Sequence, residues 1–259
     1  MKKVLYTGVS AFVFALMAAS CNKEETPDPT PPITDSTDTS KTAPSFTPSI
    51  ADINGSMVAL QTKTTVTQSG FSVDSKVETA TAVFYSTGTT LVDAGTVSVN
   101  GFDLTKQTNN SYLKTPSATS TALSLNFPTG ANWSVSGNSN VSAISYAHGT
   151  TFPEYTGDVP TSITKANGLS FNFNSSNVKY ADSVYVFIAT SNGTTFIKAF
   201  GANAGSVSIS ASELSNLPTN SNSSAFLEVI PVTYTVQNIS GKRYAFIKEQ
   251  ACVKNVNIN

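Results

Sequence analysis

The side chains that could act as acids, bases or metal ligands are few in this chain. His148 is the only histidine, and Glu154 and Asp158 are the closest carboxylates within an aromatic stretch. A triad around His148 lacks the Gly-x-Ser-x-Gly turn that presents a nucleophile, and one imidazole does not make a histidine-based zinc or haem site. Glu154 and Asp158 suit a glycosidase pair or a calcium site only at the right separation. We therefore expect no catalytic residue, metal or cofactor, with His148 and both acids on solvated loops.

Aromatic rings are interleaved with asparagines between residues 133 and 155. A flat ring packs on the apolar side of a pyranose while amides bond its hydroxyls, so Trp133, Tyr146 and Tyr155 are candidates for a glycan contact. The alternative is that these rings fill the core of a first domain or the joint between two domains. The sequence leaves both interpretations open.

The thiol of Cys21 stands where covalent modification is expected. Lys2 and Lys3 precede an uncharged, largely apolar run from Val4 to Ala19, which closes on small residues directly before Cys21. This pattern is typical of a secretory signal peptide and is too short for a stable membrane span. A peptidase that leaves cysteine first usually leaves it for acylation, and several acyl chains form a stable anchor. A plain signal peptide with an incidental cysteine is the alternative.

Two short motifs around Cys21 resemble those of a known class of lipoproteins. Ala18-Ala19-Ser20-Cys21 resembles a bacterial lipobox, with Ala at the first position where Leu is usual. Lys23, Glu24 and Glu25 resemble the tag that sends lipoproteins of the Bacteroidota type to the outer face of the outer membrane. The resemblance implies lipidation of Cys21, an outer-membrane location with exposure at the cell surface, and the membrane itself as the partner of the anchor.

Charge and cysteine content exclude several classes of function. Only 12% of the residues are charged, the formal net charge is -1, and Arg243 is the only arginine. A nucleic-acid partner would require clustered Lys and Arg, so we expect none. Once Cys21 is acylated, Cys252 has no partner for a disulfide, and its place in an alternating run predicts a buried structural thiol.

Composition divides the chain into four parts. Residues 1–20 form the signal peptide, and residues 21–48 hold the lipidated cysteine and a linker rich in Pro, Thr, Ser and Asp. That linker is nearly free of large apolar residues, so we expect it to be disordered. Residues 49–160 and 161–259 are predicted to be two β-rich domains.

Short β-branched or aromatic runs separated by turn residues predict the strands. Asn100-Gly101 and Asn192-Gly193 are hairpin signals, Ser240-Gly241 joins two longer strands, and Ser210 to Glu213 has the form of a capping box that predicts a helical turn over Ala211 to Asn216. The predicted strands are Met57–Leu60, Ala80–Tyr85, Gly95–Val99, Ala122–Phe127, Asn132–Val135, Val141–Tyr146, Gly168–Phe173, Ser183–Ala189, Thr194–Phe200, Ser206–Ile209, Ala225–Gln237 and Lys242–Val256.

The spacing in the last hundred residues resembles an immunoglobulin or fibronectin type III-like sandwich, which implies an immunoglobulin-like C-terminal domain. Alternation in Ser183–Ala189 places Val184, Val186 and Ile188 on one face, and we expect these three in its core together with Phe226, Val229 and Phe246. The opposite face carries Tyr185 and Phe187 and is also apolar, so this strand should lie centrally or be covered.

These features predict an all-β protein of two antiparallel sandwiches behind a signal peptide and a linker. The expected function is a non-enzymatic cell-surface lipoprotein with a structural, adhesive or binding role toward a protein or glycan. One alternative is a glycan-binding accessory lipoprotein of a polysaccharide-uptake system, because starch-utilisation lipoproteins resemble this layout. A glycoside hydrolase is the second alternative, and the scarcity of histidine and paired acids weighs against it.

Overall fold

The structure, a computed structural model, describes residues 53–68, 71–86, 90–115, 124–149, 151–174 and 176–259. The chain divides into two compact units, residues 1–42 and 43–259, and all described residues belong to the second. Apart from two short 3-10 turns, the described elements are strands, which confirms the all-β prediction. Within the described part of the chain, no helix has the length and apolar character needed to cross a membrane.

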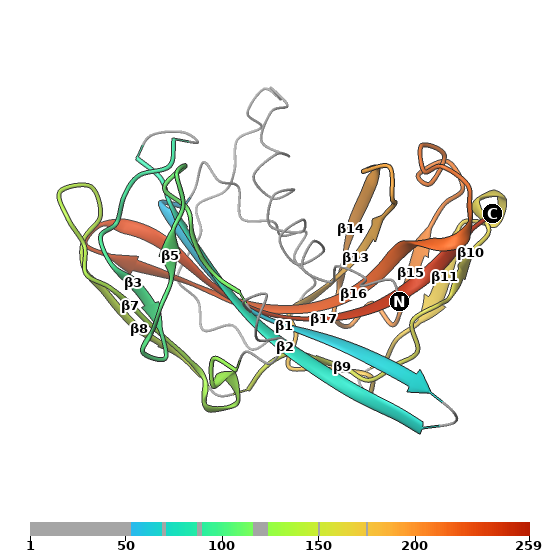
Figure 1. Ribbon diagram of the computed structural model, residues 1–259, viewed down its shortest axis with the longest axis horizontal. Coiled ribbons are helices and arrows are strands. Elements are labelled where there is room, and N and C mark those ends of the chain that lie inside the picture. The colour runs from blue at the N-terminus through green and yellow to red at the C-terminus, as the bar shows by residue number, and fades with distance from the viewer. Residues whose placement is uncertain (1–52, 69–70, 87–89, 116–123, 150, 175) are drawn as a thin grey trace. The chain divides into compact units, whose positions relative to one another are not determined.

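A nine-stranded sheet is the centre of this unit (Figure 1). Its strands follow the order β14-β13-β16-β17-β1-β2-β6-β5, and β10 pairs with the far end of β17. The bounds are β1 Gly55–Gln68, β2 Phe71–Phe84, β5 Thr105–Lys106, β6 Tyr112–Lys114, β10 Ser162–Ile163, β13 Ser183–Ala189, β14 Thr195–Gly201, β16 Asn220–Ile239 and β17 Lys242–Ile258.

The pairing of β1 with β17 joins the two halves of the chain. These strands are parallel, with Gly55 opposite Tyr244 and Lys63 opposite Cys252. β1 also forms an antiparallel hairpin with β2, and β17 forms one with β16. The expected domain boundary at residue 160 therefore lies inside one compact unit whose central sheet draws strands from both sides of it.

Two separate groups of shorter strands form second layers. A four-stranded sheet contains β3 (Val97–Val99), β4 (Phe102–Asp103), β7 (Ala131–Val135) and β8 (Ile144–His148). The other group contains the pairs β11 (Leu169–Asn172) with β15 (Ser206–Ile209) and β9 (Glu154–Tyr155) with β12 (Val178–Lys179). The first group packs on Met57, Phe84 and Phe246, which we call the first core, and the second packs on Val186, Val229 and Val256, the second core.

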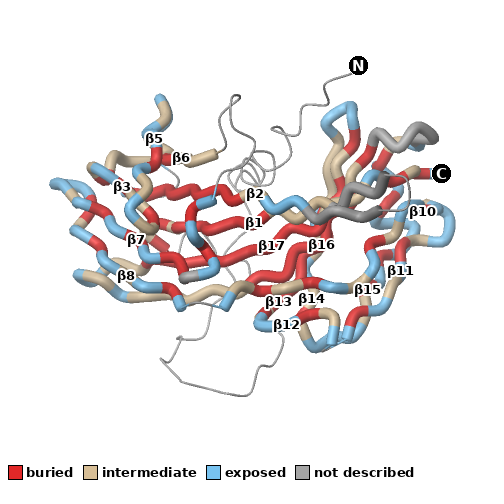
Figure 2. The backbone as a smooth tube through the Cα atoms, turned by 60° about the horizontal axis from the view of Figure 1, so that its bottom comes forward, coloured by how far each residue is buried: buried red, intermediate tan, exposed pale blue. Residues whose placement is uncertain are grey.

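Both cores use the same face of the long sheet. Side chains alternate along a strand, and every β17 residue in either core has an even number: Tyr244, Phe246, Cys252, Val256 and Ile258. We call this side the packed face and the other side the reverse face. In Figure 2, the middle parts of β16, β17 and β1 are buried. The sandwich prediction is thus confirmed at the level of layered β-sheets, with one sheet serving two second layers.

The local turn signals are realised as predicted. Asn100 and Gly101 have φ values of 50° and 81°, and Ser240 and Gly241 have 54° and 78°, which fits two-residue turns with two left-handed positions. The backbone N–H of Ser210 donates to Glu213 at 2.8 Å, and the N–H of Glu213 donates to the Ser210 hydroxyl at 3.4 Å, so the capping box forms.

Two strand-level predictions differ from the structure. In the predicted strand over Ala122–Phe127, residues 124–126 are irregular and Phe127 begins a 3-10 turn, while 122 and 123 lie outside the described residues. Three N–H or O–H groups of this stretch, on Ser124, Leu125 and Phe127, donate to the Glu78 carboxylate instead of to a ladder. Phe246 is buried as predicted but in the first core, and Phe226 is half-buried on the reverse face.

Candidate functional site

The residues with the strongest sequence signals lie outside the described part of the chain. These are Cys21 and the tag residues Lys23, Glu24 and Glu25, together with the linker that follows them. The structure therefore describes only the remaining candidate residues, which are Trp133, Tyr146, His148, Glu154, Tyr155 and Asp158.

The three aromatic candidates do not share an exposed face. Trp133 lies in the first core with 2% of its surface exposed, and Tyr155 lies in the second core with 1% exposed. Tyr146 is half-buried and packs on Phe246, with 4.0 Å between ring centroids. This burial fits the interpretation that Trp133 and Tyr155 fill the protein core rather than contact a glycan.

The two loop acids are not held together. Glu154 belongs to β9, where it pairs with Lys179, and it is half-buried. Asp158 is exposed, and its backbone carbonyl accepts the hydroxyl of Tyr155 at 2.8 Å. Among the described residues, no group of three or more His, Cys, Asp or Glu is arranged to hold a metal ion.

His148 corrects a sequence expectation, because it is buried rather than exposed on a loop. It ends β8, where it pairs with Ala131, so the strand carries the side chain against the sheet before the turn at Gly149 begins. Burial, reinforced by the positive charge of Lys248, lowers the pKa of His148 to about 4. The imidazole is therefore neutral at neutral pH.

Lys248 is buried on the packed face next to His148. Its ammonium donates to the carbonyl of Thr151 at 2.6 Å and to that of Gly149 at 3.5 Å, and it lies 5.6 Å from the centroid of the Phe152 ring. Burial lowers the pKa of Lys248. These contacts tie the chain that follows β8 to the centre of β17, which is a structural role.

A chain of amides continues this polar strip. Gln250 donates to Gln61 at 3.4 Å, and Gln61 donates to Glu78 at 3.0 Å. Along the packed face of β17, Lys248 and Gln250 stand between the first-core residue Phe246 and the second-core residue Cys252. We call Gln61, Glu78, His148, Lys248 and Gln250 the polar belt, because they separate the two cores.

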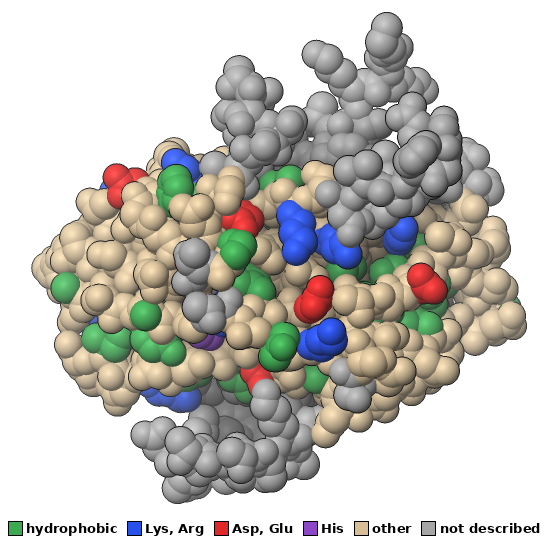
Figure 3. All heavy atoms as spheres, turned by 90° about the horizontal axis from the view of Figure 1, so that it is seen from below, with side chains coloured by type: hydrophobic (Ala, Val, Ile, Leu, Met, Phe, Trp, Pro, Cys, Tyr) green, Lys and Arg blue, Asp and Glu red, His purple; other side chains and the backbone are tan. Residues whose placement is uncertain are grey.

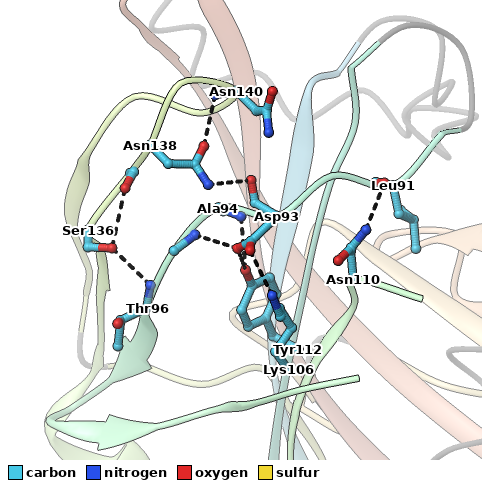
Figure 4. A network of polar contacts seen from close by, with 12 residues as sticks. Leu91, Asp93, Ala94, Thr96, Lys106, Asn110, Tyr112, Ser136, Asn138 and Asn140 are labelled. Atoms are coloured by element: carbon cyan, nitrogen blue, oxygen red, sulfur yellow. Dashed lines mark hydrogen bonds and ion pairs between the residues drawn. The ribbon is translucent and has the colours of Figure 1, made fainter. Parts of the chain in front are cut away.

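A second polar network fastens the loops beside the first core (Figure 4). Asp93 forms an ion pair with Lys106 at 2.7 Å and accepts the N–H of Gly95 and the hydroxyl of Tyr112, both at 2.8 Å. These donors, Lys106 first, hold the pKa of Asp93 well below its usual range. Burial raises the pKa of Tyr112 to about 12, so its hydroxyl stays protonated. The contacts drawn join Asp93 and its neighbours to loops from several parts of the chain, which indicates a scaffold.

The reverse face of the long sheet is different, because its apolar side chains belong to neither core. Register places Leu60 beside Glu249 on β17, and Phe187 beside Glu228 on β16. No second layer of described strands packs here, since both groups of shorter strands contact the packed face. The buried apolar residues of the reverse face are Val58, Leu60, Val83, Tyr185, Phe187, Ile230, Val232, Ala245, Ile247 and Ala251.

Two carboxyl groups interrupt this apolar surface. Glu228 is 1% exposed and Glu249 is 3% exposed. Burial, with a smaller contribution from Glu249, raises the pKa of Glu228 to about 8, and burial raises the pKa of Glu249 to about 7. The Oε1 atom of Glu228 has no hydrogen-bond partner among the described residues. A buried carboxyl without a partner is unfavourable and calls for an explanation.

On the face of the molecule that is seen from below, positive and negative side chains are interspersed (Figure 3). Within the registers of β13, β14, β16, β17, β1 and β2, the reverse face carries no lysine, and its one arginine is Arg243 beside the β16–β17 turn. Glu228 and Glu249 therefore define the electrostatics of its centre.

Comparison with known proteins leaves the site to be judged on its geometry. No protein-family model matches the chain, and no curated protein matches it either.

Sequence reasoning did not single out Glu228 or Glu249. The available signals were the lone acid in the apolar run Phe226 to Pro231 and the apolar second face predicted for Tyr185 and Phe187. Glu249 lies between Lys248 and Gln250, so its own run gave a weaker signal. Which faces of three different strands coincide depends on their registers, and these are set by long-range pairing.

Proposed function

We propose that this protein is a non-enzymatic lipoprotein, anchored in the outer membrane through Cys21 and displayed at the cell surface, with a binding role. The lipobox-like residues up to Cys21 and the tag Lys23-Glu24-Glu25 support the location. The structural contacts of Lys248 and Asp93 support a non-enzymatic role, because they fasten loops and strands.

The reverse face is the observation that carries the binding role. A sheet face that meets only water usually carries polar side chains, whereas this one is apolar across β13, β16, β17 and β1. These side chains are buried although neither core contains them, so they require apolar contacts beyond those that the described second layers supply. Its position on the most extensively paired strands gives it a rigid frame, which lowers the entropy lost on binding.

Glycan binding remains the alternative, but it would use other residues than those expected from sequence. Trp133 and Tyr155 are in the cores, whereas Tyr180 is 61% exposed and is the large aromatic residue that the described part of the chain presents to solvent. Tyr180 also has a φ of 56°, a conformation that is unfavourable for a bulky side chain.

An uncharged apolar dye tests the binding role. We expect Nile red to bind the folded full chain with a blue-shifted emission, and replacement of both Ile230 and Ile247 by Ser to weaken binding by about tenfold. Tyr180→Ser is the control, because Tyr180 is exposed and lies outside the strands of the long sheet. Equal binding by the double variant and the control, both folded by circular dichroism, would remove the reverse face from the function.

Location is tested in cells. A clickable palmitate analogue should label the wild-type protein, and Cys21→Ala should lose the label. Replacing Lys23, Glu24 and Glu25 by Ala should leave a labelled protein that added protease no longer removes from intact cells. Unchanged labelling of Cys21→Ala would refute the anchor, and unchanged shaving of the triple variant would refute the tag.

A further inference from the structure

We propose that Glu228 binds the protonated amino group of a long-chain amine, whose hydrocarbon chain lies along the reverse face. The proposal rests on the binding role given above to the same face and names the chemistry of its ligand. It follows from the placement of one unpartnered carboxyl within an apolar surface and from the charges around it.

Strand register places Glu228 at the heart of that surface. On one side Glu228 is opposite Phe187 of β13, and on the other it is opposite Val253 of β17. The next residue along β16 on the same face is Ile230, which is 2% exposed, followed by Val232, which is 4% exposed. A chain that extends from Glu228 along β16 therefore meets hydrocarbon.

The Glu228 carboxyl has unused hydrogen-bonding capacity. Its Oε1 atom is buried and lacks a partner among the described residues, although most buried polar groups in proteins are paired. By contrast, Glu78 on the packed face accepts the side-chain N–H of Gln61 at 3.0 Å and the backbone N–H of Leu125 at 2.5 Å. A ligand amine would supply the donor that Glu228 lacks and would form a charge-assisted hydrogen bond.

Charge selects an amine over an anionic lipid. Glu249 lies on the neighbouring strand, opposite Val232, and adds a second carboxyl to the same face. Glu249 lies four residues along β17 from Val253, the residue opposite Glu228, which is a distance of roughly 13 Å. Glu249 therefore acts on the amine through space rather than by contact. A ligand carboxylate or phosphate would find no lysine on this face, and Arg243 lies beyond Glu249 at the turn.

The same carboxyls argue against a second copy of the chain as the occupant. Face-to-face contact of two copies would bury carboxyls against carboxyls and would bring no amine to Glu228 Oε1. A long-chain amine brings that donor and an apolar body in one molecule.

Photoaffinity labelling of the full chain in outer membranes tests the proposal. A decylamine carrying a diazirine on its chain should label the tryptic peptide that contains Glu228, and matched decanol and decanoic acid probes should label it at least tenfold less. Glu228→Gln should lower labelling by the amine about tenfold, and Glu249→Gln two- to threefold. Asp103→Asn, which changes an exposed carboxyl on β4, should label like the wild type.

The outcomes separate this inference from the proposed function. Equal labelling by the alcohol or the acid would overturn the amine while leaving an apolar binding face. Labelling that is insensitive to Glu228→Gln would overturn the role of Glu228. If Glu228→Gln fails to fold, Glu228→Asp decides: it keeps the carboxyl group, so the amine must still label it more than the alcohol does. Loss of both Nile red binding and labelling from the wild-type protein would refute the binding face itself.

Discussion

The two faces of the long sheet are built from the same strands, yet their buried carboxyls differ: Glu78 on the packed face accepts hydrogen bonds, whereas Glu228 Oε1 on the reverse face has no partner among the described residues. On the packed face, the polar belt joins Gln250, Gln61 and Glu78 by hydrogen bonds and ties Lys248 to backbone carbonyls. On the reverse face, Glu228 and Glu249 lie among apolar side chains, and Glu228 Oε1 has no partner among the described residues. A strand with a side-chain period of two can thus place a structural surface and the proposed binding surface back to back.

The difference also appears in the direction of the pKa shifts. On the packed side, burial lowers the pKa of the bases His148 and Lys248. On the reverse face, burial raises the pKa of the acids Glu228 and Glu249. Both shifts favour the neutral form. The buried bases should make the unfolding free energy fall as pH decreases, and the buried acids should make it fall as pH increases.

The largest expected effect comes from neighbouring residues of β17 that point to opposite faces. Phe246→Ala should cost about 3–5 kcal/mol of unfolding free energy, because Phe246 is fully buried in the first core. Ile247→Ala should cost less than half as much, since no second layer of described strands packs on the reverse face there. Urea unfolding followed by Trp133 fluorescence measures both values.

Equal costs for Phe246→Ala and Ile247→Ala would contradict the distinction between the two faces. Tyr180→Ala is a suitable control, because Tyr180 is exposed and its truncation should leave the urea midpoint nearly unchanged.

Glu228→Gln should give the next largest effect, and only at alkaline pH. The pKa of Glu228 rises from 4.5 to about 8 on folding, so the folded state holds the proton between those values while the unfolded state has lost it. Stability therefore falls as pH rises from 4.5 to 8, and glutamine removes this loss. We expect the variant to gain roughly 3 kcal/mol of unfolding free energy over the wild type at pH 9 and nothing near pH 4.5. One pKa unit corresponds to about 1.4 kcal/mol, and partial relaxation of the folded protein around the ionised carboxyl reduces the total.

Urea midpoints at pH 4.5 and pH 9 measure that gain. A difference between Glu228→Gln and wild type that does not change with pH would show that the carboxyl is solvated in the folded protein. Asp103→Asn, at an exposed site, should show no such difference at either pH.

His148→Gln should give the smallest effect and the opposite sign of pH dependence. The pKa of His148 falls from 6.5 to about 4 on folding, so the unfolded state takes up a proton first as pH decreases. The wild type should lose roughly 1–2 kcal/mol between pH 6.5 and pH 4, and the variant should not share this loss. Parallel stability curves for both proteins over this range would place His148 in solvent.

Sequence alone gave the local structure of this protein and little of its assembly. Positions Asn100-Gly101 and Ser240-Gly241 specify their turns through left-handed backbone conformations, and Ser210 with Glu213 specifies a capping box. These signals act over a few residues and do not depend on the rest of the fold. The strand Ser183–Ala189 was predicted with its observed bounds, and its pairing on both sides fits the apolar character of both its faces.

What sequence could not supply is the long-range pairing. Phe246 joins the first core because β17 pairs with β1, and His148 is buried because β8 pairs with β7. A histidine before a glycine looks like a turn residue when only its neighbours are considered. Glu228 and Glu249 could not be recognised as members of one surface, because the relative register of β16 and β17 places them there.

The parallel pairing of β1 with β17 has a consequence for how the chain reaches its native state. The paired strands are 189 residues apart in the chain, so contacts at the centre of the sheet close only after synthesis has passed β17. Closing a loop of this length is entropically costly, and folding rates fall as contacts become more distant in sequence. A nascent chain that still lacks β17 therefore cannot complete either core, since β17 contributes residues to both. Formation of the β16–β17 hairpin is thus the step that allows both cores to close.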